Sequence, residues 1–213
     1  MDLQDFFANI SGARIQTVFR TIGYPESVAD LLGGICTNAV RGYGELYRRP
    51  HLPQGAPTSP ALANLSAFSL DVRLSGLARS FGATYTRYAD DLTFSGPPRF
   101  GTSLRDFIPL VSQIVRQERF RLQASKRRVL RSTGQLIVTG VVVNEKLNVS
   151  RRDFDRLKAV LTNCARRGAA SQNRAGHPHF VAHLRGRIAQ VTQLNSARGA
   201  RLLAIYNQID WNR

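Results

Sequence analysis

Two adjacent aspartates, Asp90 and Asp91, stand between two short runs of strand-forming residues, and this arrangement restricts how the chain can fold. The runs are Thr-Tyr-Thr-Arg-Tyr at 84–88 and Leu-Thr-Phe at 92–94, rich in β-branched and aromatic residues. We therefore predict a β-hairpin with both acids at its tip. Like charges side by side repel, and a bound divalent cation would relieve that repulsion. The plainer alternative is an ordinary solvated turn.

Most of the remaining chain predicts helices. Segments with apolar residues at helical spacing are expected to be helical: 12–22, 25–37, 60–80, 103–118, 151–167, 179–193 and 197–209. The apolar stripe of the second segment consists of Val28, Leu31, Leu32 and Ile35. Short strands are expected near 120–123, 128–131, 136–143 and 147–149, and Ser150 resembles a helix N-cap. Since strands end near residue 150, we predict an α+β fold in residues 1–149 followed by a helical region in residues 150–213.

The charge of the chain indicates a polyanionic partner. Thirty Lys and Arg against fourteen Asp and Glu give a formal charge of +16, and each neutralised phosphate releases counterions. An anionic membrane is the competing partner, but no apolar run reaches the roughly 20 residues of a spanning helix, and no signal pattern is present. Two cysteines, Cys36 and Cys164, form neither a disulfide framework nor a zinc cluster. We therefore expect a cytoplasmic protein that binds nucleic acid.

A site for chemistry on phosphates needs a further carboxylate from another strand, and Asp2 is the candidate. Two divalent ions about 4 Å apart can activate an attacking hydroxyl and stabilise the leaving phosphate oxygen. Mg²⁺, or Mn²⁺ as a substitute, prefers carboxylate oxygens. We therefore expect two divalent metal ions near Asp2, Asp90 and Asp91, an arrangement suited to adding a nucleotide to a 3′-hydroxyl.

Three strings in the chain resemble those of a known family: Asp2-Leu-Gln-Asp-Phe-Phe7, Leu52-Pro-Gln-Gly-Ala-Pro-Thr-Ser-Pro60 and Tyr85-Thr-Arg-Tyr-Ala-Asp-Asp91. In this order they resemble the successive palm motifs of reverse transcriptases. Their residues are most similar to those of the bacterial retron and group II intron branch. The resemblance covers nearly the whole chain. It implies a polymerase palm with an antiparallel sheet and packed helices in residues 1–149, a helical thumb in residues 150–213, and RNA-directed DNA polymerase activity.

The resemblance also implies roles for the acids and their neighbours. Asp2 and Asp90 match the principal magnesium ligands of the family, and Asp91 matches the third, auxiliary acid. The backbone of Leu3 would complete a metal shell. These residues would therefore form the catalytic centre.

Five further residues match positions around the incoming nucleotide. The backbone of Asp5 would lie beside the triphosphate, and Phe7 matches the aromatic steric gate that excludes a 2′-hydroxyl. Gln54 and Gly55 match the loop that touches the nascent base pair, and Lys126 approximately matches the lysine that protonates pyrophosphate. Plainer explanations are a core residue for Phe7, turn chemistry for Gln54 and Gly55, and a solvated basic run for Lys126.

Two features of the C-terminal half resemble RNA contacts. Val138, Thr139 and Gly140 resemble the Val-Thr-Gly motif with which retron reverse transcriptases touch their structured RNA, although a plain strand also explains them. Arg185 and Arg187 flank Gly186 in a helix that resembles the thumb helix following the template–primer groove, where Gly permits close approach and Arg meets phosphates. An amphipathic helix with a solvated basic face is the alternative. Three of the four histidines are expected in loops or on the surface: His177, His179 and His183.

The resemblance implies a retron-like enzyme with several partners. These are a structured non-coding RNA template, a DNA or RNA primer, deoxynucleoside triphosphates and an effector protein, in antiphage defence. The alternatives are a group II intron or diversity-generating reverse transcriptase, and a non-catalytic RNA-binding palm module. A fingers region would precede Asp2 in the family and is not in this sequence. We therefore expect poor primer extension by this chain alone, and an Asp2 that lacks the residues which normally hold it in place.

Overall fold

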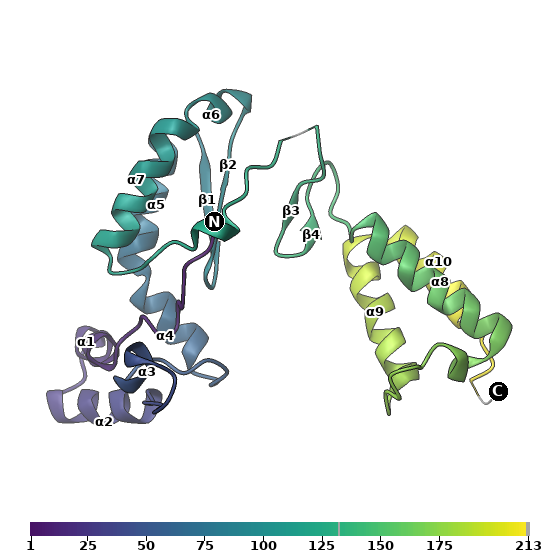
Figure 1. Ribbon diagram of the computed structural model, residues 1–213, viewed down its shortest axis with the longest axis horizontal. Coiled ribbons are helices and arrows are strands. Elements are labelled where there is room, and N and C mark those ends of the chain that lie inside the picture. The colour runs from purple at the N-terminus through teal and green to yellow at the C-terminus, as the bar shows by residue number, and fades with distance from the viewer. Residues whose placement is uncertain (132, 212–213) are drawn as a thin grey trace. The chain divides into compact units, whose positions relative to one another are not determined.

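The computed structural model describes residues 1–131 and 133–211. The chain forms two compact units, Met1–Arg128 and Val129–Arg213, the first purple to teal and the second mostly green to yellow (Figure 1). Helices are mixed with small antiparallel sheets, which confirms the α+β prediction. The assignment of a palm to residues 1–149 and a thumb to residues 150–213 stays a prediction. Among the described residues, none of the helices combines the length and apolar character that crossing a bilayer requires.

The first unit is a set of helices around one β-hairpin (Figure 1). Its helices are α1 (Gly12–Ile22), α2 (Glu26–Cys36), α3 (Glu45–Arg48), α4 (Ser59–Ser66), α5 (Phe68–Ser80), α6 (Pro98–Thr102), α7 (Leu104–Gln117) and the 3-10 helix η1 (Ala124–Lys126). The strands β1 (Thr84–Tyr88) and β2 (Asp91–Ser95) are antiparallel, with Tyr88 opposite Asp91 and Thr84 opposite Ser95. The predicted hairpin is therefore confirmed.

One face of the hairpin packs against the core of the first unit. Phe107, Val111 and Val115 recur every four residues on α7 and are fully buried. The ring of Phe107 lies 4.9 Å from that of Phe94 on β2 and 5.2 Å from that of Phe81. Aromatic pairs at these distances add to the free energy gained by burial. The hairpin that carries the two aspartates is thus supported by a packed helical layer.

The helix predicted over 60–80 is present but interrupted at Ala67. Ala67 has φ −91° and ψ 5°, which separates α4 from α5. Hydrogen bonding nevertheless continues across the break, since the N–H of Ala67 donates to Ala63 O at 3.0 Å and that of Asp71 to Ala67 O at 2.9 Å. The break is therefore a local change in backbone direction within one helical segment.

Most of the apolar stripe of α2 is exposed among the described residues, and only Leu32 is half-buried. Leu31 and Ile35 are 65% and 73% exposed, whereas the small residues Ala29 and Gly33 are buried. A Cβ added at Gly33 would lie 2.5 Å from a side-chain carbon of Gln16 on α1. The two helices therefore pack closely through small residues, and the side chains of Leu31 and Ile35 face outward.

The second unit is a short hairpin followed by a helical core (Figure 1). Its elements are β3 (Ile137–Val138), β4 (Val141–Val142), α8 (Arg151–Arg167), the 3-10 helix η2 (Ala169–Ser171), α9 (Phe180–Leu194) and α10 (Ser196–Tyr206). The hydroxyl of Ser150 accepts from the N–H of Asp153 at 3.1 Å, which confirms the predicted N-cap. Residues buried between the three helices include Leu157, Leu161, Leu184, Ile188 and Leu202.

Two strand predictions in this region are wrong. Residues 128–131 form no strand. Residues 136–143 form a hairpin rather than one strand, because Thr139 and Gly140 both have positive φ, 47° and 82°. Two successive positive φ values are typical of the type I′ turn that joins strands directly. The predicted strand at 147–149 is reduced to one bridge between Asn148 and Val142.

Candidate active site

The first residues of the chain lie between two other backbone segments and are hydrogen-bonded on both sides. Asp2 pairs with Asp91 of β2, and the N–H of Leu3 donates to Asp90 O at 2.8 Å. On the opposite side, the N–H of Gln123 donates to Asp2 O, also at 2.8 Å. The expectation that Asp2 lacks residues to hold it in place is therefore wrong, because two neighbouring segments fix its backbone.

Asp90 lies in the two-residue turn of the hairpin, after Ala89. Ala89 has φ 50°, a left-handed conformation that residues other than glycine rarely adopt. Arg87 supports this turn by donating from Nη1 to Ala89 O at 2.9 Å. The same guanidinium also binds Asp71 on α5 through two hydrogen bonds. The tip is thus tied to the helical layer behind it, and Asp90 projects from a fixed backbone.

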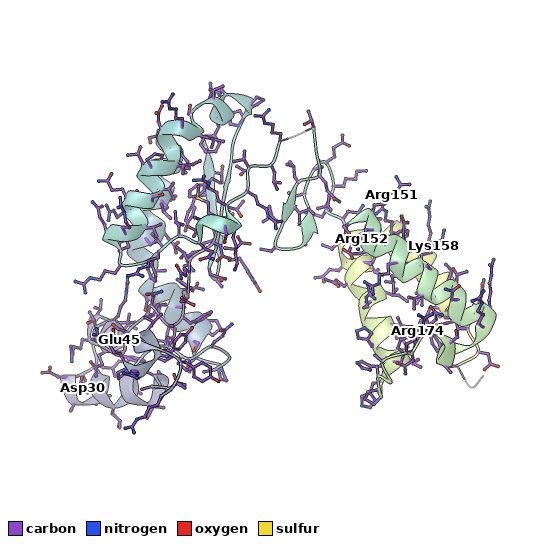
Figure 2. All side chains as sticks on the ribbon, viewed as in Figure 1. Asp30, Glu45, Arg151, Arg152, Lys158 and Arg174 are labelled. Atoms are coloured by element: carbon purple, nitrogen blue, oxygen red, sulfur yellow. The ribbon has the colours of Figure 1, made fainter. Side chains whose placement is uncertain are left out.

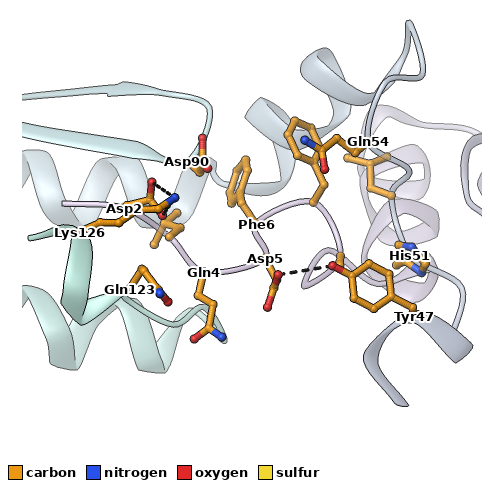
Figure 3. Close-up of a pocket in the computed structure, with 14 residues that line it drawn as sticks. Asp2, Gln4, Asp5, Phe6, Tyr47, His51, Gln54, Asp90, Gln123 and Lys126 are labelled. Atoms are coloured by element: carbon orange, nitrogen blue, oxygen red, sulfur yellow. Dashed lines mark hydrogen bonds and ion pairs between the residues drawn. The ribbon is translucent and has the colours of Figure 1, made fainter. Parts of the chain in front are cut away.

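A cavity of about 390 Å³ brings together most of the predicted site residues of the first unit. Asp2, Asp90 and Lys126 lie on one side of it, Gln54 lies on the other, and Asp5 lies between (Figure 3). Leu3 and Phe7 also contribute to the wall, whereas Asp91 and Gly55 are not among the lining residues. Residues from four separated parts of the sequence therefore meet around one space.

The ammonium of Lys126 is paired with Asp2. Its Nζ lies 3.1 Å from Oδ1 and 3.0 Å from Oδ2 (Figure 3). These hydrogen bonds, followed by the negative charge of Asp2, raise the pKa of Lys126 above its ordinary value, and Asp90 and Asp91 act in the same direction. Lys126 is therefore protonated at neutral pH and close to all three acids, as a donor of protons to phosphate would need to be.

The carboxylates of the three acids are the type of ligand that a hard cation binds. In the described residues, however, no group of three or more His, Cys, Asp or Glu lies close enough together to hold a metal ion. Asp2 and Asp90 place carboxylate oxygens in one cavity wall, and Mg²⁺ prefers such oxygens. Asp91 follows Asp90 directly and pairs with Asp2 through one isolated antiparallel bridge. An ion held by all three acids would require their side chains to turn toward one another and Lys126 to release Asp2.

The two phenylalanines of the first motif have different surroundings. Phe6 is 3% exposed and packs against Phe120, with ring centroids 5.4 Å apart. Phe7 is only partly buried and contributes to the cavity wall. Gly55, next to Gln54, has φ 95°, which requires glycine at that turn. Both rings line the cavity, but Phe6 is almost fully buried in the core, whereas Phe7 is more exposed and therefore fits a role at the cavity better.

Several residues of the cavity region were not identified from the sequence. Tyr47, His51 and Gln123 line the cavity, and Asn9 hydrogen-bonds to the turn at Asp5. The sequence signal for Asn9 is its residue type four positions after Asp5, since Asn side chains commonly bond nearby backbone groups in turns. Tyr47 and His51 carried no such signal, because their contacts join segments far apart in the sequence.

The predicted RNA-binding residues belong to the second unit. Thr139 and Gly140 form the exposed tip of the β3–β4 hairpin, and Val138 ends β3. Arg185 is exposed on α9 and Arg187 is partly buried. This unit contains 14 Lys and Arg against four Asp and Glu. Basic side chains extend from α8 and the loop after it, including Arg151, Arg152, Lys158 and Arg174 (Figure 2).

The sequence profile described as "Reverse transcriptase (RNA-dependent DNA polymerase)" matches residues 1–150, the part of the chain that contains the cavity. The chain belongs to the reverse transcriptase family. It is 41% identical over 210 residues to the retron Mx65 reverse transcriptase of Myxococcus xanthus. Identities are 35% to the retron Mx162 reverse transcriptase of the same organism and 31% to the retron Ec86 reverse transcriptase of Escherichia coli.

The alignments cover most of this chain but only part of each relative. The alignments cover 95%, 94% and 99% of the chain, and 47%, 48% and 59% of the three relatives in the same order. The chain therefore spans about half the length of these reverse transcriptases. The matches include nearly all of both units, and the family profile includes the whole region of the cavity.

Proposed function

We propose that this chain carries the catalytic centre of a retron-like RNA-directed DNA polymerase that adds deoxynucleotides to a primer. The observation that carries the proposal is the meeting of Asp2 and Asp90 with Phe7 and Gln54 around one cavity. Membership of the reverse transcriptase family and 31–41% identity to three retron enzymes support it. The basic second unit supports a nucleic acid partner.

In this proposal each cavity residue acts on one part of the reaction. Asp2 and Asp90, with Asp91 and the Leu3 backbone, would hold two magnesium ions, which would supply activation of the primer hydroxyl and charge stabilisation of the leaving phosphate. Phe7 packs against the sugar and excludes a 2′-hydroxyl. These assignments rest on the placement of Asp2 and Asp90 and on the aromatic wall beside them.

Gln54 and Gly55 contact the nascent base pair in the same proposal, and Lys126 donates a proton to the leaving pyrophosphate. Pairing with Asp2 raises the pKa of Lys126, so its ammonium is charged at neutral pH and can donate a proton. In the second unit, Val138, Thr139 and Gly140 contact a cognate structured RNA, while Arg185 and Arg187 contact the template–primer duplex. We extend the proposal to the remaining implications of the retron resemblance, a small DNA–RNA product, an effector protein and antiphage defence.

The test is primer extension on RNA with an active form of the protein that contains this chain. Asp90→Asn should reduce extension by several orders of magnitude and leave RNA affinity nearly unchanged, because affinity comes from Lys and Arg. Asp30→Asn, which changes an exposed acid paired with Arg20, is the matched control and should keep full activity. Full extension by Asp90→Asn would overturn the proposed mechanism.

A non-catalytic RNA-binding module is the second candidate, and one observation favours it. Lys126 occupies both oxygens of Asp2, and the described residues contain no ready-made group of three metal-binding side chains. The two candidates differ in whether the acids bind metal. Binding of Mn²⁺ by the unsubstituted chain, weakened in Asp90→Asn, supports the polymerase. RNA binding without any Mn²⁺ binding supports the binding module.

A further inference from the structure

The turn that follows Leu3 has a strained backbone at Asp5. Asp5 has φ 47°, in the left-handed region that residues other than glycine rarely adopt. A strained conformation of this kind persists only where surrounding contacts impose it, and such residues concentrate at functional sites. The turn lies in the wall of the cavity, so the contacts that impose its shape bear on whatever the cavity binds.

Asn9 provides the main contacts that fix this turn. Its side-chain Nδ2 donates to Gln4 O at 2.9 Å and to Asp5 O at 3.1 Å, and its backbone N–H donates to Asp5 O at 2.9 Å. The carbonyl groups of Gln4 and Asp5 are therefore both directed toward Asn9. One side chain thus sets the orientation of two successive peptide groups.

The same turn also contains backbone hydrogen-bond donors that are left unpaired among the described residues. In the part of the protein that the structure describes, the N–H groups of Asp5, Phe6, Phe7 and Ala8 form no well-aligned hydrogen bond to another residue. All four residues line the cavity. Successive backbone N–H groups in a turn of mixed handedness form concavities that bind anions. Turning the carbonyl groups toward Asn9 leaves these donors available for the phosphates of a nucleotide.

Tyr47 of α3 restrains Asp5 from the other side of the cavity (Figure 3). Its hydroxyl donates to Asp5 Oδ1 over 3.4 Å, and its ring stands edge-on to His51 at 5.3 Å. His51 is 4% exposed, and its Nδ1 lies 2.8 Å from Arg49 O, so this nitrogen carries the proton. His51 therefore holds Tyr47 in position, and Tyr47 connects Asp5 with the segment that leads to Gln54.

We propose that Asn9 and Tyr47 are positioning residues that hold the Asp5–Ala8 turn in shape to bind the triphosphate of the incoming nucleotide. This inference rests on the proposed function, since it takes a nucleoside triphosphate as the ligand of the cavity. Asn9 orients the backbone donors, and Tyr47 restrains the Asp5 side chain. Phe7 lies within the same turn, so its ring position also depends on these contacts.

The test measures triphosphate binding without turnover. A deoxynucleoside triphosphate and inorganic tripolyphosphate are titrated calorimetrically into the chain with Ca²⁺ in place of Mg²⁺, and melting temperatures are recorded. Asn9→Ala should weaken both ligands by about tenfold, as expected for the loss of a hydrogen-bonding clamp. Tyr47→Phe, which removes only a hydroxyl, should weaken both by about threefold. Neither change should alter RNA affinity.

Two control variants separate positioning from general stability. Asn173→Ala removes a similar side-chain clamp on a turn in the second unit, where Asn173 bonds both the N–H and the C=O of His177. Tyr43→Phe alters an aromatic residue that is 76% exposed. Both should bind the triphosphate and tripolyphosphate like the unsubstituted chain. Equal weakening in Asn173→Ala would overturn the inference.

The remaining outcomes are equally decisive. Unchanged binding in Asn9→Ala and Tyr47→Phe, with good binding by the unsubstituted chain, overturns the positioning roles and leaves the proposed function intact. If Asn9→Ala does not fold, Tyr47→Phe alone decides, since it leaves the packing of the ring in place. No binding of the triphosphate by the unsubstituted chain overturns both the inference and the proposed ligand.

Discussion

The guanidinium of Arg87 holds the carboxylate of Asp71 with two hydrogen bonds, Nε to Oδ1 at 2.8 Å and Nη2 to Oδ2 at 2.7 Å. The Arg87 side chain is only 5% exposed and that of Asp71 32%. Through its third nitrogen Arg87 also supports Ala89 O in the turn before Asp90. This pair therefore links helix α5 to the tip of the acidic hairpin.

Removing the guanidinium should destabilise the first unit. Arg87→Ala leaves the Asp71 carboxylate without its cation, and we expect the free energy of unfolding to fall by about 3 kcal/mol, the lower end for broken buried pairs. Chemical denaturation measures this value. Arg105→Ala, an exposed arginine on α7, is the control and should change it little. A loss as small as that of the control would mean that the pair contributes nothing to stability.

The raised pKa of Tyr85 should make the free energy of unfolding depend on pH in the alkaline range. Burial, and then its hydrogen bond to Asp71, raises the pKa of Tyr85 well above its ordinary value of about 10. The unfolded chain therefore loses this proton above about pH 10 while the folded chain keeps it, and the free energy of unfolding falls as pH rises. Below about pH 10 this contribution is fully present.

The measurement is the free energy of unfolding between about pH 9 and about pH 11. The unsubstituted chain should lose stability more steeply above about pH 10 than Tyr85→Phe, which has no phenol to ionise. Tyr88→Phe, at a ring that is 73% exposed, should behave like the unsubstituted chain. Parallel curves for Tyr85→Phe and the unsubstituted chain would contradict a raised pKa at Tyr85.

Lys126 should compete with metal for Asp2. Its ammonium bonds both carboxylate oxygens, so a cation can use them only after Lys126 moves away. Lys126→Met should therefore raise the affinity for Mn²⁺ several-fold, measured by calorimetry or electron paramagnetic resonance. The gain is modest because Lys126 is exposed and its pairing is screened by solvent. Lys146→Met is the control, and weaker Mn²⁺ binding in Lys126→Met would show that the lysine assists the metal.

Local sequence patterns predicted most of the fold, because hairpins and helices depend on neighbouring residues. The hairpin at 84–95, the N-cap at Ser150 and the helix over 151–167 all follow from residue type and spacing. The exposed stripe at Leu31 and Ile35 shows the limit, since helical spacing identifies a helix but not which face packs. At Gly33 the close approach of α1 decided that question.

The candidate site also contains features that the sequence predicted and features that it did not. The motifs singled out Asp2, Asp90, Phe7 and Gln54 directly from the sequence, and the structure brings these four residues around one cavity. The pairing of Lys126 with Asp2 joins residues 124 positions apart, and that of Tyr47 with Asp5 joins residues 42 apart. Such contacts depend on the folded arrangement of several segments and leave no local pattern.

Phe7 should determine the choice between deoxy- and ribonucleotides. If its ring packs against the sugar, Phe7→Val makes room for a 2′-hydroxyl, and incorporation of ribonucleotides should rise relative to deoxynucleotides. Single-nucleotide extension at fixed magnesium by an active form of the protein measures the ratio. Phe81→Val is the control, because Phe81 is also partly buried but packs on Phe107 in the core. An unchanged ratio with retained activity would make Phe7 a core residue.

Gly186 on α9 should lower the stability of the helix and favour binding of nucleic acid. A Cβ added there would meet nothing within 4 Å, so packing within the chain does not require glycine. Gly186→Ala should therefore stabilise the fold by about 0.5–1 kcal/mol. If the backbone between Arg185 and Arg187 approaches a template–primer duplex, the added methyl group should weaken duplex binding at the same time.

The matched control is Gly76→Ala on α5, where an added Cβ also meets nothing within 4 Å. It should give a similar gain in stability without any change in duplex affinity. Arg185→Ala should weaken duplex binding and reduce its salt dependence by about one phosphate contact, measured from roughly 50 to 200 mM salt. Gly186→Ala should leave that salt dependence unchanged, because it removes no charge. Equal duplex affinity in Gly186→Ala and the unsubstituted chain would mean that α9 meets nucleic acid only through its arginine side chains.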